Sequence, residues 1–431
     1  MSITQTPVPA LCPQCHSRLA DEGGELPWCE RCEWNLAFRA PDPALGRFTD
    51  RQERWAHRIG YRLDADLFTK LSGHPLTRPG TTAVSAALTA VSVLVIGILL
   101  GLAVGGLWLV VAGPFLLKLI GVIMIGCALL CRPRLGRVAP LREKYDELSR
   151  TGQPELFALI DRVAAAAGAP VPDLVLLSPE WGASAAVLGL RRRRVLTLGL
   201  PLWSSLRPQE RVVLLAHELG HFVNNDNRRS LRTQPALAFF GDVAELLSPL
   251  RRLVEEDDEE PVAAFARLGQ SALGQLLWPA ARAAWLVHVL LHVLGARDAQ
   301  RAEYHADDTA ARIGGTTATG SLMDVVACGH LHRTVVGSRA RGGARAAGWR
   351  EAVEQTRAAL EPRLGRLRQL TRRRDASPFS SHPPAGLRHR MAVTQPYRSA
   401  QVVLTEAAAE RLDAELAGFE EGYRRVIAAS W

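Results

Sequence analysis

The longest apolar pattern in the 431-residue chain runs from residue 81 to residue 131, and its only charged residue is Lys118. A helix crosses a bilayer with about 20 apolar residues, so this stretch predicts two crossings. We expect the break between them near Gly105-Gly106 or near Gly113-Pro114. A hairpin buried in a soluble core is the weaker interpretation, because helices of soluble proteins are seldom apolar on every side.

Basic residues flank this predicted hairpin on both sides. The flanking residues are Arg62, Lys70 and Arg78 before it, and Arg132, Arg134, Arg137, Arg142 and Lys144 after it. Basic flanks favour the cytoplasmic side of a membrane. We therefore expect a multi-pass integral protein of the cell membrane, with both termini and the large carboxyl-terminal region in the cytoplasm.

Beyond the hairpin, the pattern switches between helical and strand periodicity. Residues 153–170 predict an amphipathic helix that starts near Pro154 and stops at Gly168. Residues 173–178 predict a strand, and residues 183–202 predict two strands joined around the arginines at 191–194. A helix follows, with Pro208 in its first turn. The expected fold class is α+β, mainly helical, with one small sheet.

Two further apolar stretches, residues 236–250 and 271–295, interrupt this region. The second is long enough to span a membrane, but it contains Pro279 and Arg282. We expect helices that lie on or dip into the membrane, or pack inside the domain. Whether residues 271–295 cross the bilayer stays open.

The amino-terminal 40 residues carry four of the seven cysteines as two Cys-x-x-Cys pairs, Cys12 with Cys15 and Cys29 with Cys32. The chain starts without the basic and apolar pattern of a secretory signal, so the pairs indicate metal ligands in a reducing compartment rather than disulfides. Four thiolates suit tetrahedral zinc, which predicts a structural zinc ribbon. A thioredoxin-like redox pair would need a βαβ context that is missing here.

Residues 41–80, between the ribbon and the hairpin, predict a linker with one amphipathic helix, which is either solvated or laid on a membrane surface. The formal net charge is +9, which fits nucleic acid, an anionic membrane or a solubilising shell. No stripe of basic and aromatic residues accompanies the ribbon, and the arginine runs do not cluster near it. We therefore expect no nucleic-acid partner.

The clearest candidate chemistry is "HELGH", residues 217–221. Positions four apart share a helix face, so His217 and His221 can hold one zinc ion, with Glu218 placed to take a proton from water on the metal. An ordinary helix that carries two histidines is the alternative. His288 and His292 are also four apart, but they lack the glutamate and predict no second site.

A catalytic zinc with two histidines needs a third protein ligand. The candidate is Glu303, which we expect to begin a short helix within "AEYHADDTAARIGG". Asp307 lies one turn further on the same face and can accept a hydrogen bond from a ligand histidine. A capped, salt-bridged helix start is an equally good explanation of these two carboxylates from the residues alone.

Three blocks, "HELGHFVNND", "EYHAD" and "SHPPAGLRHR", follow the hairpin in that order. In this respect the chain resembles the HtpX-like and CAAX prenyl endopeptidase family of integral-membrane zinc metallopeptidases, which are HExxH gluzincins. The resemblance covers residues 140–400. It implies a zincin-like metalloprotease domain with a small edge sheet, zinc ligands at His217, His221 and Glu303, the catalytic base at Glu218, and a ligand-supporting role for Asp307.

The resemblance also implies that the "SHPP" segment borders the active-site cleft. His382 is then a catalytic candidate that hydrogen-bonds the oxyanion, and Arg388 braces the segment or the site; a structural Pro-Pro turn is the alternative. Asn224 and Asp226 match positions that cap and brace the metal helix. Relatives often have an Asn-Ala-x segment on the strand beside the cleft, where this chain has Ser184. Such an edge strand can still pair with an extended peptide.

The expected organisation is a zinc ribbon (1–40), a linker (41–80), a transmembrane helical hairpin (81–131) and an HExxH zinc metallopeptidase domain (140–431) with membrane-associated helices around 236–295. The expected activity is hydrolysis of peptide bonds in membrane or membrane-proximal proteins, with one catalytic and one structural zinc ion. The expected partners are a protein or peptide substrate, the lipid bilayer, and a protein that binds the ribbon. The alternative is a catalytically inactive membrane scaffold whose ribbon binds a partner.

Overall fold

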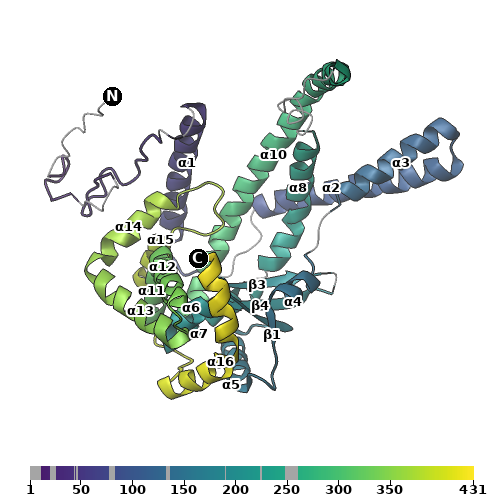
Figure 1. Cartoon of the computed structure of the whole chain (residues 1–431). Coiled ribbons are helices and arrows are strands. Elements are labelled where there is room, and N and C mark those ends of the chain that lie inside the picture. The colour runs from purple at the N-terminus through teal and green to yellow at the C-terminus, as the bar shows by residue number, and fades with distance from the viewer. Residues whose placement is uncertain are drawn as a thin grey trace. The chain divides into compact units, whose positions relative to one another are not determined.

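The computed structural model describes most of the chain and divides it into two compact units (Figure 1). It describes residues 11–19, 26–42, 44, 47–76, 83–132, 136–189, 191–223, 226–247 and 261–431. For residues 48, 226–233, 246, 247 and 261–277 it describes the backbone alone. The first unit comprises residues 1–79, 137–225 and 299–431, and the second comprises residues 80–136 and 226–298.

The described residues of the first unit form one small mixed sheet. Its strands are β1 (Asp146–Leu148), β2 (Leu174–Ser178), β3 (Ala183–Leu188) and β4 (Arg193–Gly199), in the order β1-β2-β4-β3. β2 and β4 are parallel, and the two outer pairs are antiparallel. Every residue of β2 is buried, as its continuous apolar sequence predicts. β3 pairs only with β4 among the described strands, so its outer edge keeps free backbone groups.

Helices surround this sheet and build the main core. They are α4 (Ala139–Lys144), α5 (Pro154–Ala167), α6 (Leu200–Ser205), α7 (Pro208–Val223), α11 (Thr316–Ala327), α12 (Gly329–Arg341), α13 (Ala346–Leu360), α14 (Leu364–Arg374), α15 (Ala385–Thr394) and α16 (Glu406–Ser430), with a 3-10 turn at Glu361–Arg363. α5 begins at Pro154, and Gly168 caps its carboxyl end with a left-handed φ of 62°. The mainly helical α+β class with a small mixed sheet is thus confirmed.

The amino-terminal region belongs to the first unit as well. The amphipathic helix expected between residues 41 and 80 is α1 (Arg47–Leu71). Leu67 and Phe68 of α1 pack with Tyr304, Leu387 and Met391 in one buried cluster. The segment that links the ribbon to the hairpin therefore also contributes a packed helix to this unit.

The second unit contains α2 (Ala83–Ala112), α3 (Phe115–Leu130), α8 (Asp226–Leu247) and the part of α10 (Pro261–Gly314) that ends at Asp298. The break in the apolar stretch falls at Gly113-Pro114, the second of the two expected places. α2 and α3 touch where Gly106 faces Gly121, because a Cβ at residue 106 would lie 2.7 Å from the Gly121 carbonyl oxygen. Such close backbone approach is typical of helices packed in membranes.

The apolar helices of this unit expose large side chains. Val93, Leu94 and Trp108 of α2 are each more than 60% exposed. Within the described residues, two helical segments are long and apolar enough to cross a membrane, α2 and Trp278–Gly314. They suggest membrane association. α3 has 16 residues, or about 24 Å of helix, against a hydrocarbon core of about 30 Å. The two crossings expected within residues 81–131 stay a prediction.

The glycine contact between α2 and α3 gives a first prediction. Gly106→Val should force the two helices apart and destabilise the hairpin by about 1–3 kcal/mol, as overpacking does. The matched control is Gly97→Val in the same helix, where a Cβ meets no atom within 4 Å. Thermal unfolding of the detergent-purified protein measures both variants. Equal shifts of the midpoint would contradict the assigned contact.

Candidate active site and metal centres

α7 carries the two histidines of "HELGH" within a mostly buried helix of the first unit. Its polar residues His217 and Glu218 are 7% and 6% exposed, in a helix whose sequence is otherwise mostly apolar. The rings of His217 and His221 lie 4.9 Å apart, edge to face. The four-residue spacing thus brings both imidazoles to one face, as predicted.

The carboxylates come from α10, which corrects one expectation. Glu303 does not begin a short helix: it lies within the 54-residue helix α10. The sequence changes from apolar to polar around residues 296–308 without a break in the helix. The change falls where α10 passes from the second unit to the first, at Ala299. α7 and α10 approach closely at Gly220, where a Cβ would lie 3.3 Å from Ala306 Cα.

This approach assembles the candidate ligands in one buried cluster. His217, His221 and Glu303 each offer one ligand atom, and these atoms all lie within 4.8 Å of one another. His217 Nε2 lies 3.5 Å from Glu303 Oε2, and His221 Nε2 lies 3.6 Å from Glu303 Oε1. The Nε2 atoms of both histidines therefore face the carboxylate.

Asp307 and Arg388 lie directly behind these residues. His217 Nδ1 lies 3.0 Å from Asp307 Oδ1. Arg388 of α15 donates to both oxygens of Asp307, from Nε at 2.8 Å and from Nη2 at 2.7 Å, and its Nη1 lies 3.2 Å from Glu303 Oε2. The carboxylate of Asp307 thus orients the ring of His217, and Arg388 holds both carboxylates in place.

Charge dominates this buried cluster. Burial alone would raise the pKa of Asp307, but the charge and hydrogen bonds of Arg388 lower it to about 2. Arg388 also holds the pKa of Glu303 well below its usual range despite burial. Burial disfavours the charged form of His217, yet its hydrogen bonds to Asp307 and Glu303 raise its pKa to about 10. The cluster therefore favours positive charge between two ionised carboxylates.

The donor set fits a zinc ion. Two imidazole nitrogens and one carboxylate are the three protein ligands of many catalytic zinc sites, which keep a further position open. Glu303 Oε2 is buried, and Arg388 Nη1 lies 3.2 Å away as an ion-pair partner without forming a hydrogen bond to it. A metal ion would add the direct ligand contact that this buried oxygen lacks among the described residues.

The remaining predicted site residues fall in three places. His382 lies beside the cluster, with Nδ1 3.0 Å from Glu303 Oε1, and its side chain is 66% exposed. Ser184 is exposed on the edge strand β3, next to α7 in the fold. Asn224 lies outside the described residues, and Asp226 is the first residue of α8, where the backbone alone is described.

The amino-terminal cysteines form the second candidate metal centre. The Sγ atoms of Cys12 and Cys32 are 3.6 Å apart, and those of Cys15 and Cys29 are 3.3 Å apart. All four atoms lie within 4.8 Å of one another. Zinc–sulfur bonds of about 2.3 Å in a tetrahedron require sulfur atoms about 3.8 Å apart, so the cluster is of the right size.

The two cysteine turns repeat one backbone geometry. His16 N donates to Cys12 O at 2.9 Å, and Glu33 N donates to Cys29 O at 2.8 Å. His16 and Glu33 have φ of 57° and 59°. Two equivalent turns present their thiols to one point, which favours a shared ion over a disulfide. The redox alternative also lacks the βαβ setting in the described part of this region.

The ribbon docks on α14, and this corrects the view of the arginine runs. Arg373 donates to the carbonyl oxygens of Leu26, Leu36 and Asn35 at 2.7 to 3.1 Å. Arg366 and Arg372 pair with Glu30 and Glu33 of the ribbon. A basic run does cluster at the ribbon, but these arginines are occupied by intramolecular contacts. The sequence feature that could have indicated this contact is the acidic pair Glu30 and Glu33 in the second cysteine turn, together with the basic sequence of α14.

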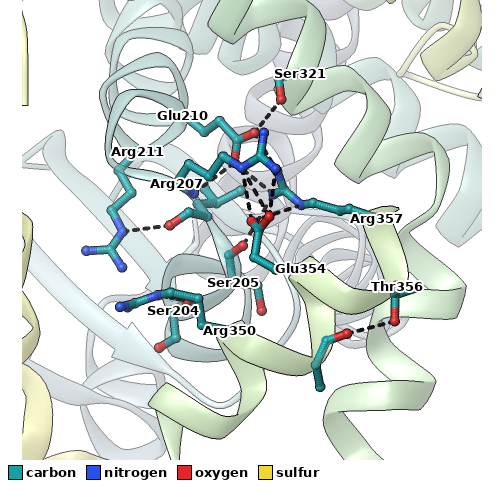
Figure 2. A network of polar contacts seen from close by, with 12 residues as sticks. Ser204, Ser205, Arg207, Glu210, Arg211, Ser321, Arg350, Glu354, Thr356 and Arg357 are labelled. Atoms are coloured by element: carbon teal, nitrogen blue, oxygen red, sulfur yellow. Dashed lines mark hydrogen bonds and ion pairs between the residues drawn. The ribbon is translucent and has the colours of Figure 1, made fainter. Parts of the chain in front are cut away.

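A polar network anchors the start of α7 (Figure 2). Glu210, in the first turn, accepts from the backbone N–H of Arg207 at 2.9 Å and from both terminal nitrogens of Arg357, at 2.7 and 2.8 Å. Ser321 donates to the same carboxylate. A negative charge at a helix amino terminus is favourable. This buried cap fixes the helix that carries the histidines, and its only local sequence signal is an acidic residue in the first turn.

His288 and His292 do not form a metal group with a third ligand among the described residues. Their rings are 6.0 Å apart, and His288 Nδ1 lies 3.0 Å from the Leu237 carbonyl oxygen within the second unit. The His288 ring thus contacts the backbone of α8 within the second unit.

A histidine pair on one helix, a glutamate between them and a carboxylate from a second helix define the class of zinc-dependent metallopeptidases. Residues 151–394, more than half of the chain, match the model of Peptidase family M48, and the chain belongs to this family of zinc metalloendopeptidases. The match runs from the turn before α5 to the last residue of α15, so it contains every residue of the buried cluster. No curated protein and no solved structure matches the chain.

The contact between Asp307 and His217 gives a prediction for zinc affinity. Asp307→Asn should weaken binding at this site by about 10- to 100-fold, because the support of a ligand histidine is lost. Asp308→Asn is the control, since that carboxylate pairs with Arg398 at 2.7 Å outside the cluster. A chelator-competition titration that resolves two zinc ions measures both variants. Equal affinities would show that Asp307 does not support the ligand.

Proposed function

We propose that this M48 peptidase is an HtpX-like, membrane-anchored metalloendopeptidase that hydrolyses peptide bonds of membrane or membrane-proximal proteins. The observation that carries the proposal is the buried meeting of His217, His221 and Glu303, with Glu218 on the same helix as the two histidines. The apolar helices of the second unit support the membrane anchor. The resemblance in the three sequence blocks supports the HtpX-like branch.

The chemistry divides between the ion and the chain. When bound, zinc supplies a Lewis acid that acidifies a coordinated water molecule and polarises the scissile carbonyl. His217, His221 and Glu303 would hold the ion. Glu218 takes the proton of the attacking water and passes it to the leaving amine. Asp307 keeps the Nδ1 side of His217 engaged, so Nε2 stays directed at Glu303, where it would help to hold the ion.

Substrate placement follows from the surroundings of the cluster. β3 is an edge strand beside α7, and an extended peptide can add to such an edge by backbone hydrogen bonds. Ser184 adds little side-chain contact, because it is short and exposed. His382 is exposed but touches Glu303, so its ring can face the substrate carbonyl and stabilise the negative charge that develops on oxygen.

The membrane arrangement and the ribbon complete the proposal. Residues 81–131 form a two-crossing hairpin with both termini and the active site cytoplasmic, supported by the basic flanks. Substrates would then be cleaved at the cytoplasmic face. The ribbon holds a structural zinc ion in Cys12, Cys15, Cys29 and Cys32, supported by the size of the thiol cluster.

The first experiment compares the wild type with Glu218→Gln in detergent, with casein cleavage or self-cleavage as the readout and zinc counted in both. The wild type should cut and the variant should not, with equal zinc, because the amide cannot accept the proton. If neither cuts although both hold the site zinc, the inactive scaffold becomes the better account of the chain.

The role of His382 gives a separate prediction. His382→Ala should lower kcat by about 100-fold, the usual effect of removing one oxyanion donor, with little loss of zinc. The ring is largely exposed, so truncation should leave the fold intact. An unchanged kcat would exclude the oxyanion role.

A further inference from the structure

We propose that Gly60 of α1 and Arg373 of α14 are positioning residues for catalysis, which hold residues 377–384 so that His382 reaches the active site. Through Arg373, the ribbon is then a structural support of the active-site wall rather than a separate recruiting module. This inference rests on the proposed function of His382. Gly60 and Arg373 lie outside the metal cluster, and the link between them and the cluster is His382, whose Nδ1 lies 3.0 Å from Glu303 Oε1.

The ribbon side of this support is a buried guanidinium. Arg373 is 6% exposed and donates hydrogen bonds to three ribbon carbonyl oxygens, with the ring of Trp28 5.1 Å away. Trp28 is fully buried and donates from Nε1 to Gln369 of α14 at 2.7 Å. A buried charge held by three carbonyl oxygens requires the folded ribbon to keep those oxygens in place.

α1 supports the same region from its own face. His57 Nε2 lies 2.7 Å from the Arg373 carbonyl oxygen, within a buried contact. One turn further along α1, Gly60 lies against residue 377: a Cβ at residue 60 would lie 2.6 to 2.7 Å from the backbone atoms of Ser377. Those atoms belong to the main chain, so no side-chain rotation can relieve the clash. Only glycine permits this approach.

The supported segment then leads to the active site. Gln300 of α10 is fully buried and donates to the Ser380 carbonyl oxygen at 3.0 Å, and Ser380 Oγ donates to the His382 carbonyl oxygen at 2.7 Å. Three residues after His382, α15 begins at Ala385. Its Gly386 donates to Thr371 Oγ1 of α14 at 2.9 Å. The segment is thus held by α1 at one end and by α10 and α14 at the other.

These contacts explain how an exposed histidine can have a defined position. The His382 side chain is 66% exposed, so packing alone does not fix it, and its ring reaches Glu303 from the position that its backbone provides. Its position is set by the backbone of residues 377–384, which α1 and the ribbon-bound α14 support. Misplacement of a catalytic group by about 1 Å can cost about 100-fold in rate, so a shift of this backbone should appear in kcat.

The test uses full-length protein in detergent and a double-mutant cycle. Gly60→Ala should lower kcat at least about tenfold and speed amide hydrogen exchange in residues 376–384, while zinc content stays unchanged. The control is Gly418→Ala in α16, a helical glycine whose Cβ would meet no atom within 4 Å. Alanine favours helices over glycine, so the control should keep kcat and gain slightly in stability.

Arg373→Met tests the ribbon contact in the same way, with Arg374→Met at the exposed neighbouring position as its control. We expect faster exchange in residues 376–384 for Arg373→Met alone. The cycle then repeats both positioning variants in the His382→Ala background. If Gly60 and Arg373 act through His382, kcat should change by less than about twofold there, because the shared contribution is already lost.

Equal losses of kcat in both backgrounds, or unchanged exchange in residues 376–384, would overturn the proposal. A general loss of stability would instead speed exchange throughout the first unit, and that result also counts against a local positioning role. An inactive wild type would remove the proposed function. The exchange measurement would still show whether Gly60 and Arg373 hold the segment, so the two failures are distinguishable.

Discussion

The buried ion cluster around Arg388 is the interaction on which the first unit depends. Two ionised carboxylates, Glu303 and Asp307, lie in a protein interior where isolated charges are costly. Arg388 contacts both, and His217 contacts both from the opposite helix. Removal of one partner from such a cluster typically costs about 3–5 kcal/mol. The same contacts tie α7, α10 and α15 together, so the metal site and the helix packing are stabilised by one set of charges.

Helix packing around the cluster also fixes the distances between the candidate ligands on α7 and α10. Gly220 allows α10 to approach α7, which brings a carboxylate within reach of both imidazoles. Glu210 caps the start of α7 through Arg357, far from the histidines along the helix. A helix fixed at its start and packed closely near its end has little freedom to change the spacing of its ligands.

The ribbon packs against the peptidase helices, whereas its sequence had indicated a separate module that binds a partner. Its cysteine turns are a local unit, with two equivalent geometries around one group of thiols. Its outer surface, however, is bound by the arginines of α14, and α1 packs beside it on the same region. A positive charge of the whole chain therefore says little about partners, because several arginines satisfy carbonyl and carboxylate groups within the first unit.

The sequence by itself determined the elements whose cause is local. The spacing of His217 and His221 sets one face of α7, the two Cys-x-x-Cys pairs set the thiol cluster, and proline and glycine set the bounds of α5 and the break after α2. Glu303 and Asp307 were found by their spacing and by resemblance. Their helix was misjudged, because periodicity cannot show that an apolar half and a polar half form one continuous α10.

Only the tertiary structure decided which distant residues meet. Arg388 lies 81 residues from Asp307 along the chain, and Arg373 lies more than 330 residues from the ribbon carbonyls that it binds. No periodicity relates such positions, because their contact depends on how α1, α10, α14 and α15 pack as complete helices. Local chemistry along the chain thus identified the candidate zinc ligands, and the packing of helices distant in sequence decided what supports them.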